Sequence, residues 1–344
     1  MEAYITMKPI RLGFIGLGHI PTRAHLPGLA PLVEAGEVTL QAFCDINEET
    51  AKTQATTFGA QAVYTDHHEM LDKEDLDAIY LCIPPTLHTD EIPIAADKGF
   101  SIFVEKPQTL DMAQAVRFET AIRKSGVVSQ VGFMSRYYPS AEEVCRRLQE
   151  RTLRHALVQR LYSGSPIRYW TSRFELCGGS FVENTIHTVD LLRYFLGDIE
   201  AVSAFYVDRK PGEGPEPMNM PHVYNVNYRF TSGITANVSV SRVLTNVSVS
   251  RGQVMLVSDD SLMEWSAQEV VENGETVWET MESHNAFTLQ AQAFVKAVRS
   301  SDPSMMRSSY ATSMNSLAAV LGANASAARG GEVIRLEDFT AGRI

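Results

Sequence analysis

The first third of the chain alternates short apolar runs with longer polar, alanine-containing stretches. The apolar runs predict buried strands at residues 11–15, 39–44, 78–83, 101–104 and 127–131. The stretches between them predict helices, for example over residues 48–58 and 90–98. Because strands and helices alternate, this part of the chain predicts βαβ units and a parallel sheet.

The pattern changes after Gly132. In residues 224–230 and 234–241 every second residue is apolar, and the turn Ser232-Gly233 separates the two segments. This alternation predicts antiparallel strands with one face on a core. The opposite face is polar but carries few charges, which leaves room for a subunit interface. Helical spacing predicts helices over residues 140–151, 287–298 and 308–329.

These patterns place the chain in the α/β class with two domains. A length of 344 residues is too great for one typical core and fits this division. We expect a nucleotide-binding domain with a parallel sheet over residues 1–130. A second α/β domain, with a mostly antiparallel sheet, is expected over residues 131–344, and the boundary falls between residues 125 and 140.

Composition and charge exclude several classes of function. Hydrophobic residues make up 44% and charged residues 21%, as in an ordinary globular protein. The net charge of -11 and the lack of any basic run argue against nucleic-acid binding. No apolar stretch has the length of a membrane span or a signal peptide. The four cysteines form no C-x-x-C pair, so we expect buried thiols, no metal site and a cytoplasmic protein.

The pair Gly16-x-Gly18 follows the first predicted strand directly and precedes a predicted helix. The first glycine permits a tight turn, and the second lets the backbone approach a pyrophosphate. Amides at the helix N-terminus then face the phosphate charge. Pro21 replaces the usual Gly or Ala at the sixth position and is tolerated at a helix start. Such a turn is common in α/β proteins, so it is the context that favours dinucleotide binding.

Asp45 ends the second predicted strand, where an acidic residue bonds the adenosine ribose hydroxyls of a dinucleotide. No arginine or lysine follows before Lys52, whereas a 2′-phosphate requires a nearby cation. The sequence therefore favours NAD over NADP. A second interpretation, compatible with the first, is that Asp45 caps the helix after Asn47.

Two further segments follow strands of the predicted parallel sheet, whose carboxyl ends line the ligand crevice. Residues 84–88 contain Thr86 and His88, which can touch the cofactor, although a local hydrogen bond at a helix start explains His88 equally well. Glu105-Lys106-Pro107 follows the next strand. A lysine between an apolar strand and a proline can bond a substrate oxygen and stabilise a developing alkoxide.

Glu183 and His187 are four residues apart and share a face if their segment is helical. Gly178-Gly179-Ser180 precedes them, which suits a close-packed entry to a helix. Taken alone, the two residues are best explained as an imidazole paired with a carboxylate on a structural helix. The other motifs favour a catalytic role.

Several motifs occur in one order along the chain. They are Gly16-x-Gly18, His25-x-Pro27-x-Leu29, Pro84-Pro85-x-x-His88, Glu105-Lys106-Pro107, Gly178-Gly179 and Glu183-x-x-x-His187-x-x-Asp190-Leu191. This ordered set, over nearly the whole chain, resembles the glucose–fructose oxidoreductase / inositol dehydrogenase / rhizopine-catabolism (Gfo/Idh/MocA) family. The resemblance implies a doubly wound Rossmann domain that binds NAD(P) and a second domain with a large open sheet. It also implies a dehydrogenase acting on CH–OH groups of sugars, inositols or related polyols and diols.

By position, the resemblance makes Lys106 the catalytic lysine and His187 the catalytic histidine. Glu183 stands where many members carry aspartate, and we expect it to orient the imidazole or support its charged form. The expected reaction moves a hydride from a hydroxyl carbon to NAD, with His187 as general base. Two alternatives remain. One is a glycosidase or lyase that uses tightly bound NAD as a redox relay, and the other is a non-catalytic regulator that binds NAD and sugar.

The expected ligand contacts follow from the motifs and the resemblance together. For the cofactor they are Gly16, Gly18, His19, Ile20, Asp45, Ile46, Pro84, Thr86, His88, Glu105 and Lys106. For the substrate they are Arg136, Arg168, Tyr169, Trp170 and Asn184, although packing explains Tyr169 and Trp170 equally well or better. We expect a homodimer or homotetramer through the open face of the C-terminal sheet, with no nucleic-acid or membrane partner.

Overall fold

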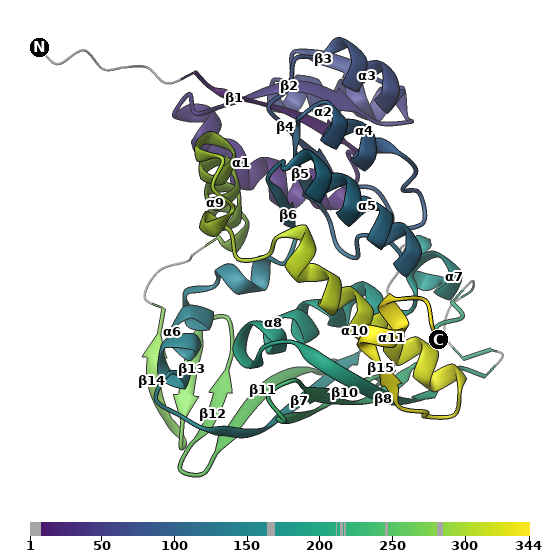
Figure 1. The fold of residues 1–344 in the computed structure, drawn as a ribbon, viewed down its shortest axis with the longest axis vertical. Helices are drawn as coiled ribbons and strands as arrows, with labels where there is room; N and C mark the ends of the chain where they lie inside the picture. The colour runs from purple at the N-terminus through teal and green to yellow at the C-terminus, as the bar shows by residue number, and fades with distance from the viewer. Residues whose placement is uncertain are drawn as a thin grey trace, which may run out of the picture.

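Six parallel strands form the N-terminal sheet of the computed structural model (Figure 1). The structure describes residues 8–163, 169–210, 212, 213, 216, 218–244, 247–280 and 285–344. The strands are β1 (Ile10–Ile15), β2 (Val38–Cys44), β3 (Ala62–Tyr64), β4 (Ala78–Leu81), β5 (Ser101–Val104) and β6 (Ser129–Val131). Their order, β3-β2-β1-β4-β5-β6, is that of a doubly wound dinucleotide-binding sheet, so the predicted parallel sheet is confirmed.

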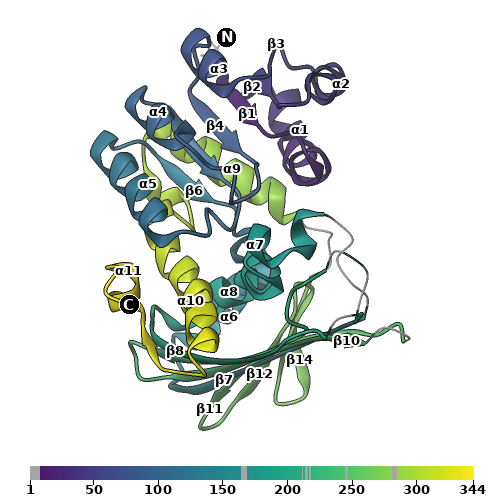
Figure 2. The same ribbon diagram turned by 90° about the vertical axis from the view of Figure 1, so that its right-hand side faces the viewer.

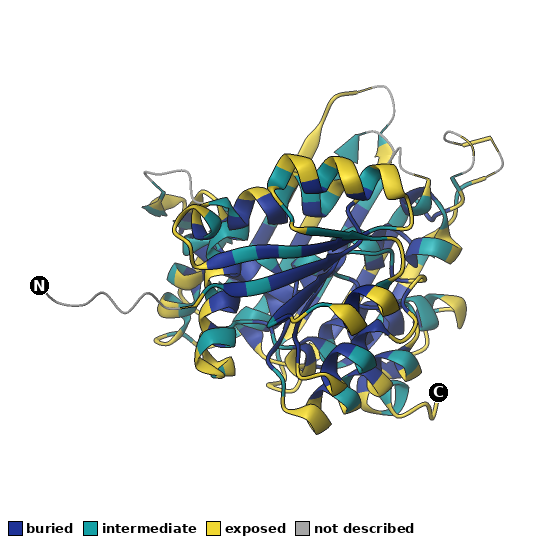
Figure 3. Cartoon of the chain, turned by 90° about the horizontal axis from the view of Figure 1, so that it is seen from above, coloured by how far each residue is buried: buried dark blue, intermediate teal, exposed yellow. Residues whose placement is uncertain are grey.

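Helices cover both faces of this sheet, and Figure 3 shows buried strands between helices whose outer faces are exposed. The helices are α1 (Leu26–Glu34), α2 (Glu48–Phe58), α3 (His67–Lys73), α4 (Glu91–Asp97) and α5 (Met112–Ser125). Local sequence fixes their ends. The Asn47 side chain accepts a hydrogen bond from the Thr50 amide at the start of α2, and Gly59 ends that helix with a φ of 80°.

The second domain is built on a nine-stranded sheet of order β14-β13-β12-β11-β7-β10-β9-β8-β15. The strands are β7 (Leu153–Ser163), β8 (Ile199–Val207), β9 (Val223–Phe230), β10 (Thr235–Leu244), β11 (Ser250–Ser258), β12 (Leu262–Trp265), β13 (Glu269–Glu272), β14 (Glu275–Glu279) and β15 (Ile334–Arg335). β7 and β10 run parallel, and the other neighbours run antiparallel. The predicted mostly antiparallel sheet is therefore confirmed.

The two faces of the large sheet differ. The described helices of the second domain lie on one side of it, and no described helix covers the opposite side (Figure 2). They are α6 (Pro139–Leu148), α7 (Phe174–Cys177), α8 (Ile186–Leu196), α10 (Tyr310–Ala328) and α11 (Leu336–Thr340). Buried and exposed residues alternate along β9, as its sequence pattern predicts. On the uncovered face the amide of Asn237 donates to Asn227 at 2.9 Å, so this surface is polar but uncharged there.

Helix α9 (Ala286–Ser300) returns from the second domain to the first and packs on α1. Its buried Ala291, Phe294 and Val295 join one core with Phe14 and Leu29 of the first domain. Within the described ranges, no helix is long and apolar enough to cross a membrane.

Candidate active site

A cavity of about 480 Å³ opens at the carboxyl ends of β1, β2, β4 and β5. The strand order reverses between β1 and β4, and ligands of doubly wound sheets bind at such a point. Trp170 and Glu183 of the second domain also line the cavity. It therefore lies between the two domains.

The glycine turn after β1 has the geometry that a pyrophosphate requires. Gly16 has a φ of 88°, and a Cβ there would lie 2.6 Å from the carbonyl oxygen of Cys82. A Cβ on Gly18 would meet no atom within 4 Å, so the backbone at Gly18 is open to a ligand. A helix begins at His19 and runs through a π-helical turn, Pro21–His25, into α1. Its first amides are free to bind phosphate oxygens.

Asp45 is partly buried at the end of β2 and lines the same cavity. Its carboxylate accepts hydrogen bonds from the amides of Leu17 at 2.8 Å and Asn47 at 2.9 Å. The cap of α2 is Asn47, so Asp45 fixes the glycine turn and keeps lone pairs for ribose hydroxyls. Ile46 is 90% exposed and adds an apolar surface to the cavity, against which an adenine ring can pack.

The segment after β4 contributes only one of the three residues expected from it, Pro84. Pro84, Pro85 and Leu87 line the cavity, but Thr86 and His88 do not. His88 is buried, and its Nδ1 forms a short hydrogen bond with the Glu91 carboxylate. His88 therefore makes the local hydrogen bond at a helix start that was offered as the alternative to cofactor contact. Burial opposes ionisation of Glu91, yet the bond to His88 lowers its pKa below the ordinary value.

Glu105 anchors the strand end that carries Lys106. The Glu105 side chain is buried and forms a 2.6 Å hydrogen bond with His25 Nε2, and it accepts the Lys106 amide at 3.0 Å. A Cβ on Gly132 would lie 2.7 Å from Glu105 Oε1, so a glycine is needed behind the carboxylate. Burial alone raises the pKa of Glu105, but His25 and Lys106 lower it below its ordinary value. Glu105 is therefore a buried anion that holds the backbone of Lys106.

The Lys106 side chain extends from the first domain to the second. Its Nζ donates to the backbone carbonyl of Glu183 at 2.8 Å and lies 3.5 Å from the Glu183 carboxylate. The Lys106 side chain is 10% exposed, so its ammonium is directed into the interdomain space. Glu183 lies on the π-helical turn Phe181–Thr185, which leads into α8. π-Helical turns are frequent at functional sites.

His187 lies in the first turn of α8, partly buried beside Lys106. Burial and the positive charges of Lys106 and Arg160 lower its pKa well below the ordinary value. The imidazole is therefore neutral at neutral pH, and its Nδ1 has no partner among the described residues. A neutral imidazole beside an ammonium can accept a proton from a hydroxyl that the ammonium binds.

The expected contact between Glu183 and His187 is corrected by the structure. The Glu183 carboxylate lies against Lys106, and no hydrogen bond joins it to His187 in the described part of the chain. The ammonium is the stronger partner because it carries a full charge, whereas the imidazole is neutral. The Glu183 carboxylate therefore contacts the Lys106 ammonium instead of the His187 imidazole.

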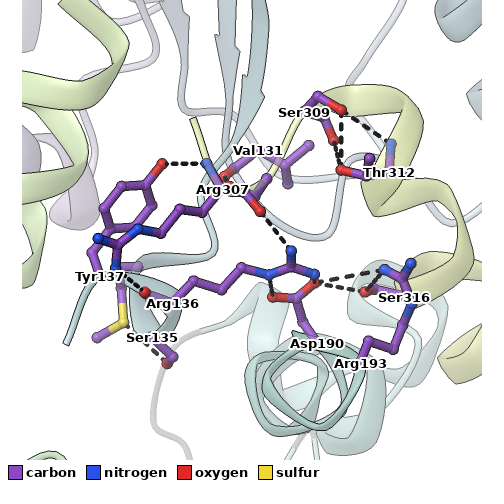
Figure 4. A network of polar contacts seen from close by, with 12 residues as sticks. Val131, Ser135, Arg136, Tyr137, Asp190, Arg193, Arg307, Ser309, Thr312 and Ser316 are labelled. Atoms are coloured by element: carbon purple, nitrogen blue, oxygen red, sulfur yellow. Dashed lines mark hydrogen bonds and ion pairs between the residues drawn. The ribbon is translucent and has the colours of Figure 1, made fainter. Parts of the chain in front are cut away.

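Arg136 is also placed differently from its expected role as a substrate contact. Its Nε and Nη2 bind the two oxygens of the buried Asp190 at 2.7 and 2.8 Å (Figure 4). Its Nη1 donates to the carbonyl of Arg307 at 2.5 Å. Ser316 of α10 donates to Asp190 as well, at 2.7 Å. Arg136 therefore ties α8, one turn after His187, to the segment that follows β6.

Of the other expected substrate contacts, Arg168 falls outside the described residues. Trp170 lines the cavity, and Asn184 is partly buried on the π-helical turn beside Glu183. Tyr169 is 63% exposed, and the Arg173 guanidinium lies 4.9 Å from its ring centre. Thr65, Thr89 and His67 line the cavity and were not expected.

His67 belongs to a cluster at the cavity rim with His68, Asp66 and Asp90. Asp90 forms hydrogen bonds with His67 Nε2 at 3.1 Å and His68 Nε2 at 3.0 Å, which lower its pKa to about 2. The bonds of His68 to Asp90 and to Asp66, the latter at 3.0 Å, raise the pKa of His68. Histidine and carboxylate side chains, which can bind metals, are thus gathered at a place where no metal site was expected. The hydrogen bonds among them account for this arrangement.

Known proteins share both halves of this architecture. The model of an oxidoreductase family with an NAD-binding Rossmann fold matches residues 10–133, and the GFO/IDH/MocA C-terminal domain matches residues 152–255. Myo-inositol 2-dehydrogenase of Thermotoga maritima is 28% identical over 196 residues, which are 57% of this chain and 58% of that protein. The alignment therefore spans less than two thirds of the relative.

Two further comparisons extend over most of the chain. The dTDP-3,4-didehydro-2,6-dideoxy-alpha-D-glucose 3-reductase of Actinomadura kijaniata is 26% identical over 327 residues, covering 88% of this chain and 91% of that one. The crystal structure of an oxidoreductase from Thermotoga maritima superimposes with a TM-score of 0.84 at 21% identity. That match covers 96% of this chain and 99% of the other, and it shows a shared fold.

Proposed function

The chain belongs to the Gfo/Idh/MocA oxidoreductase family, and from this membership and the geometry of its interdomain cavity we propose that it is an NAD(P)-dependent dehydrogenase. Its substrate is a sugar, inositol or related polyol, oxidised or reduced at one hydroxyl carbon. The observation that carries the proposal is that Lys106 reaches across from the first domain: its Nζ donates to the Glu183 carbonyl at 2.8 Å, one helical turn before His187. The Lys106 charge also lowers the pKa of His187.

The residues around the cavity fit a dinucleotide. Gly18 and the helix beginning at His19 would hold the pyrophosphate, while Asp45 and Ile46 would hold the adenosine. When bound, the nicotinamide ring accepts or donates the hydride. The open space at Gly18 supports this fit without any rearrangement of the backbone.

The protein's own residues handle the substrate oxygen and its proton. Lys106 donates a hydrogen bond to the hydroxyl oxygen and stabilises its negative charge as the C–H bond breaks. His187 accepts the hydroxyl proton, so the carbon loses a hydride, the oxygen loses a proton and a carbonyl forms. Glu183 holds the ammonium in place through the 3.5 Å contact. In the reverse reaction His187 returns the proton.

A substrate panel tests this function. Sugars, inositols, sugar acids and dihydrodiols are each incubated with the protein and NAD or NADP, and reduced cofactor is measured by absorbance. Turnover of at least one polyol, with net formation of reduced cofactor, is the expected result. Cofactor binding without turnover of any of them would instead favour a regulator or a redox-relay enzyme.

His187→Gln should lower kcat for the best substrate by about 100- to 1,000-fold, because the variant has no proton acceptor. In the wild type, kcat/KM for oxidation falls at low pH as the imidazole is protonated. Since the pKa of His187 is lowered, the midpoint of that fall should lie below about 6.5. His155→Gln, at a partly buried position on β7, is the matched control and should change neither value. A full rate in His187→Gln would contradict the assigned base.

We further propose that NAD is preferred to NADP, because the Asp45 carboxylate would repel a 2′-phosphate. Asp45→Asn keeps the shape and one acceptor but removes the charge. The ratio of kcat/KM for NAD to that for NADP should therefore fall by about 10-fold or more. The control Asp72→Asn, on exposed α3, should leave the ratio unchanged. An unchanged ratio in Asp45→Asn would show that Asp45 does not select the cofactor.

Association of subunits through the uncovered sheet face stays a prediction.

A further inference from the structure

Two arginines lie near the carboxyl ends of the neighbouring parallel strands β7 and β10. Arg160 and Arg242 continue the inward-facing rows that hold Val158 and Val240, where the apolar core of the sheet ends. The ring of Tyr162 lies beside both of them. The guanidinium carbons of Arg160 and Arg242 are 5.0 and 4.7 Å from its centre.

No carboxylate neutralises these two arginines among the described residues. Arg160 Nη1 donates to the hydroxyl of Thr188 at 2.8 Å, and Arg242 Nε donates to the hydroxyl of Ser180 at 2.6 Å. Burial lowers the pKa of Arg160, Tyr162 opposes this effect, and the neighbouring charge of Arg242 adds a smaller lowering, so burial disfavours the charged form of Arg160. A third cation, Arg209, lies beside Arg242 and donates to its carbonyl at 3.5 Å.

Other arginines of this domain are paired with acids. Arg136 binds Asp190, Arg147 binds Glu143 and Glu272, and Arg154 on β7 binds Asp259. Among the residues that the structure describes, exposed Arg251 and Arg329 have no acid either, but of the buried and partly buried arginines that pack within this domain only those of the cluster around Tyr162 lack one. Partly buried guanidinium groups that lack an anion are stabilised when a ligand supplies one.

The cluster lies next to the residues assigned to the reaction. Thr188, the partner of Arg160, directly follows His187, and Ser180, the partner of Arg242, precedes the turn that carries Glu183. The Arg160 charge also lowers the pKa of His187, which places it near the imidazole. A substrate whose hydroxyl reaches Lys106 and His187 can therefore extend toward the two guanidinium groups.

We propose that Arg160 and Arg242 bind a carboxylate of the substrate, so that the polyol oxidised by this enzyme is a sugar acid. This inference rests on the proposed dehydrogenase function and narrows its substrate class. Each planar guanidinium keeps N–H donors beyond its bond to a hydroxyl, and a carboxylate can accept from both at once. A phosphate shares the charge but not the planar shape, so a sugar phosphate is the competing ligand.

Matched substrates test the proposal through kcat/KM of NAD reduction. Glucuronate is compared with glucose, galacturonate with galactose, and glucose 6-phosphate serves as the phosphate arm. We expect the acid of each pair to exceed its neutral partner by at least about 30-fold, as for a buried charge pair. Equal or better turnover of the neutral sugars, or a preference for the phosphate, would overturn the carboxylate assignment.

Variants identify the groups responsible. Arg160→Gln and Arg242→Gln should each reduce kcat/KM for the acid by at least about 30-fold, mainly through KM. Arg242→Gln should change kcat/KM for the neutral sugar less than about 3-fold, whereas Arg160→Gln should also move the acid limb of the pH profile to higher pH, because the Arg160 charge lowers the pKa of His187. Arg242→Lys keeps the charge but loses the planar guanidinium. Its kcat/KM for the acid should lie between those of the wild type and Arg242→Gln. It also provides a readout if either Gln variant does not fold. Arg154→Gln on the same strand is the control and should behave as the wild type. Loss of acid and neutral activity in equal proportion would contradict the proposal.

A binding measurement separates this inference from the proposed function. Glucuronate is titrated into the complex of the protein with NADH, and the change in NADH fluorescence reports binding without turnover. Arg160-dependent binding in a protein that oxidises nothing would support the acid site and contradict the dehydrogenase. Lys106-dependent oxidation of neutral sugars, with no such binding, would support the dehydrogenase and contradict the acid site.

Discussion

Lys106→Met is expected to reduce kcat by about 100- to 1,000-fold while NADH affinity stays within a few-fold of the wild type. The ammonium is the positive group directed into the cavity from the end of β5, and methionine keeps its length without its charge. Oxyanion stabilisation is lost, whereas the glycine turn and Asp45 that would bind the dinucleotide are untouched. Stopped-flow turnover and NADH fluorescence titration measure the two quantities separately.

The same variant should shift the pH profile in a defined direction. The Lys106 charge lowers the pKa of His187, so its removal raises that pKa. Oxidation requires the neutral imidazole, and the acid limb of the residual activity should therefore move to higher pH. Lys106→Arg, which retains the charge, should lose rate but keep the limb near its wild-type position. Lys98→Met, at an ion pair with exposed Asp72, is the control. Turnover within 10-fold of the wild type, or an unmoved limb, would contradict the role given to Lys106.

Asp190→Ala should lower the free energy of unfolding by about 3–5 kcal/mol, because it leaves the Arg136 guanidinium buried without an anion. Asp190 is fully buried and holds Arg136 by two hydrogen bonds and Ser316 by a third (Figure 4). Urea unfolding followed by circular dichroism measures the loss. Turnover should fall too, since Asp190 lies one turn after His187 on α8.

A double replacement separates the lost pair from a general defect. Arg136→Met with Asp190→Leu removes both charges, so it should destabilise the protein less than Asp190→Ala alone. Asp259→Ala removes the partner of Arg154 in an ion pair whose two side chains are 61% and 69% exposed, and it should change stability by less than about 1 kcal/mol. If the double variant were the least stable of the three, the buried-charge explanation would be wrong.

Features with a local signal were predictable from the sequence. Strand and helix patterns predicted the parallel sheet, the hairpin at Ser232-Gly233 and most helices, because periodicity depends only on which face is buried. Gly16 and Gly18 signalled the turn after β1, and the strand-end position of Lys106 signalled its place in the crevice. The three-residue strand β3 has too little pattern to detect, and so Thr65 and His67 were missed.

Partners that depend on tertiary packing were not predictable. Arg136 and Asp190 are 54 positions apart, and nothing in the sequence distinguishes an arginine that binds a buried aspartate from one that binds a substrate. Glu183 was expected to contact His187 because four residues on a helix share a face. The approach of Lys106 from the other domain decided its partner instead. The periodic apolar face of α9 predicted a helix but not the domain on which it packs.

The return of α9 to the first domain has a consequence for folding during synthesis. Phe294 and Val295 complete a core with Phe14 and Leu29, which are made more than two hundred residues earlier. A nascent chain that has emerged only as far as α5 therefore presents α1 with an uncovered apolar surface. Burial of this surface has to wait until α9 is synthesised, so the core of the nucleotide-binding half is completed only after most of the second domain has been made.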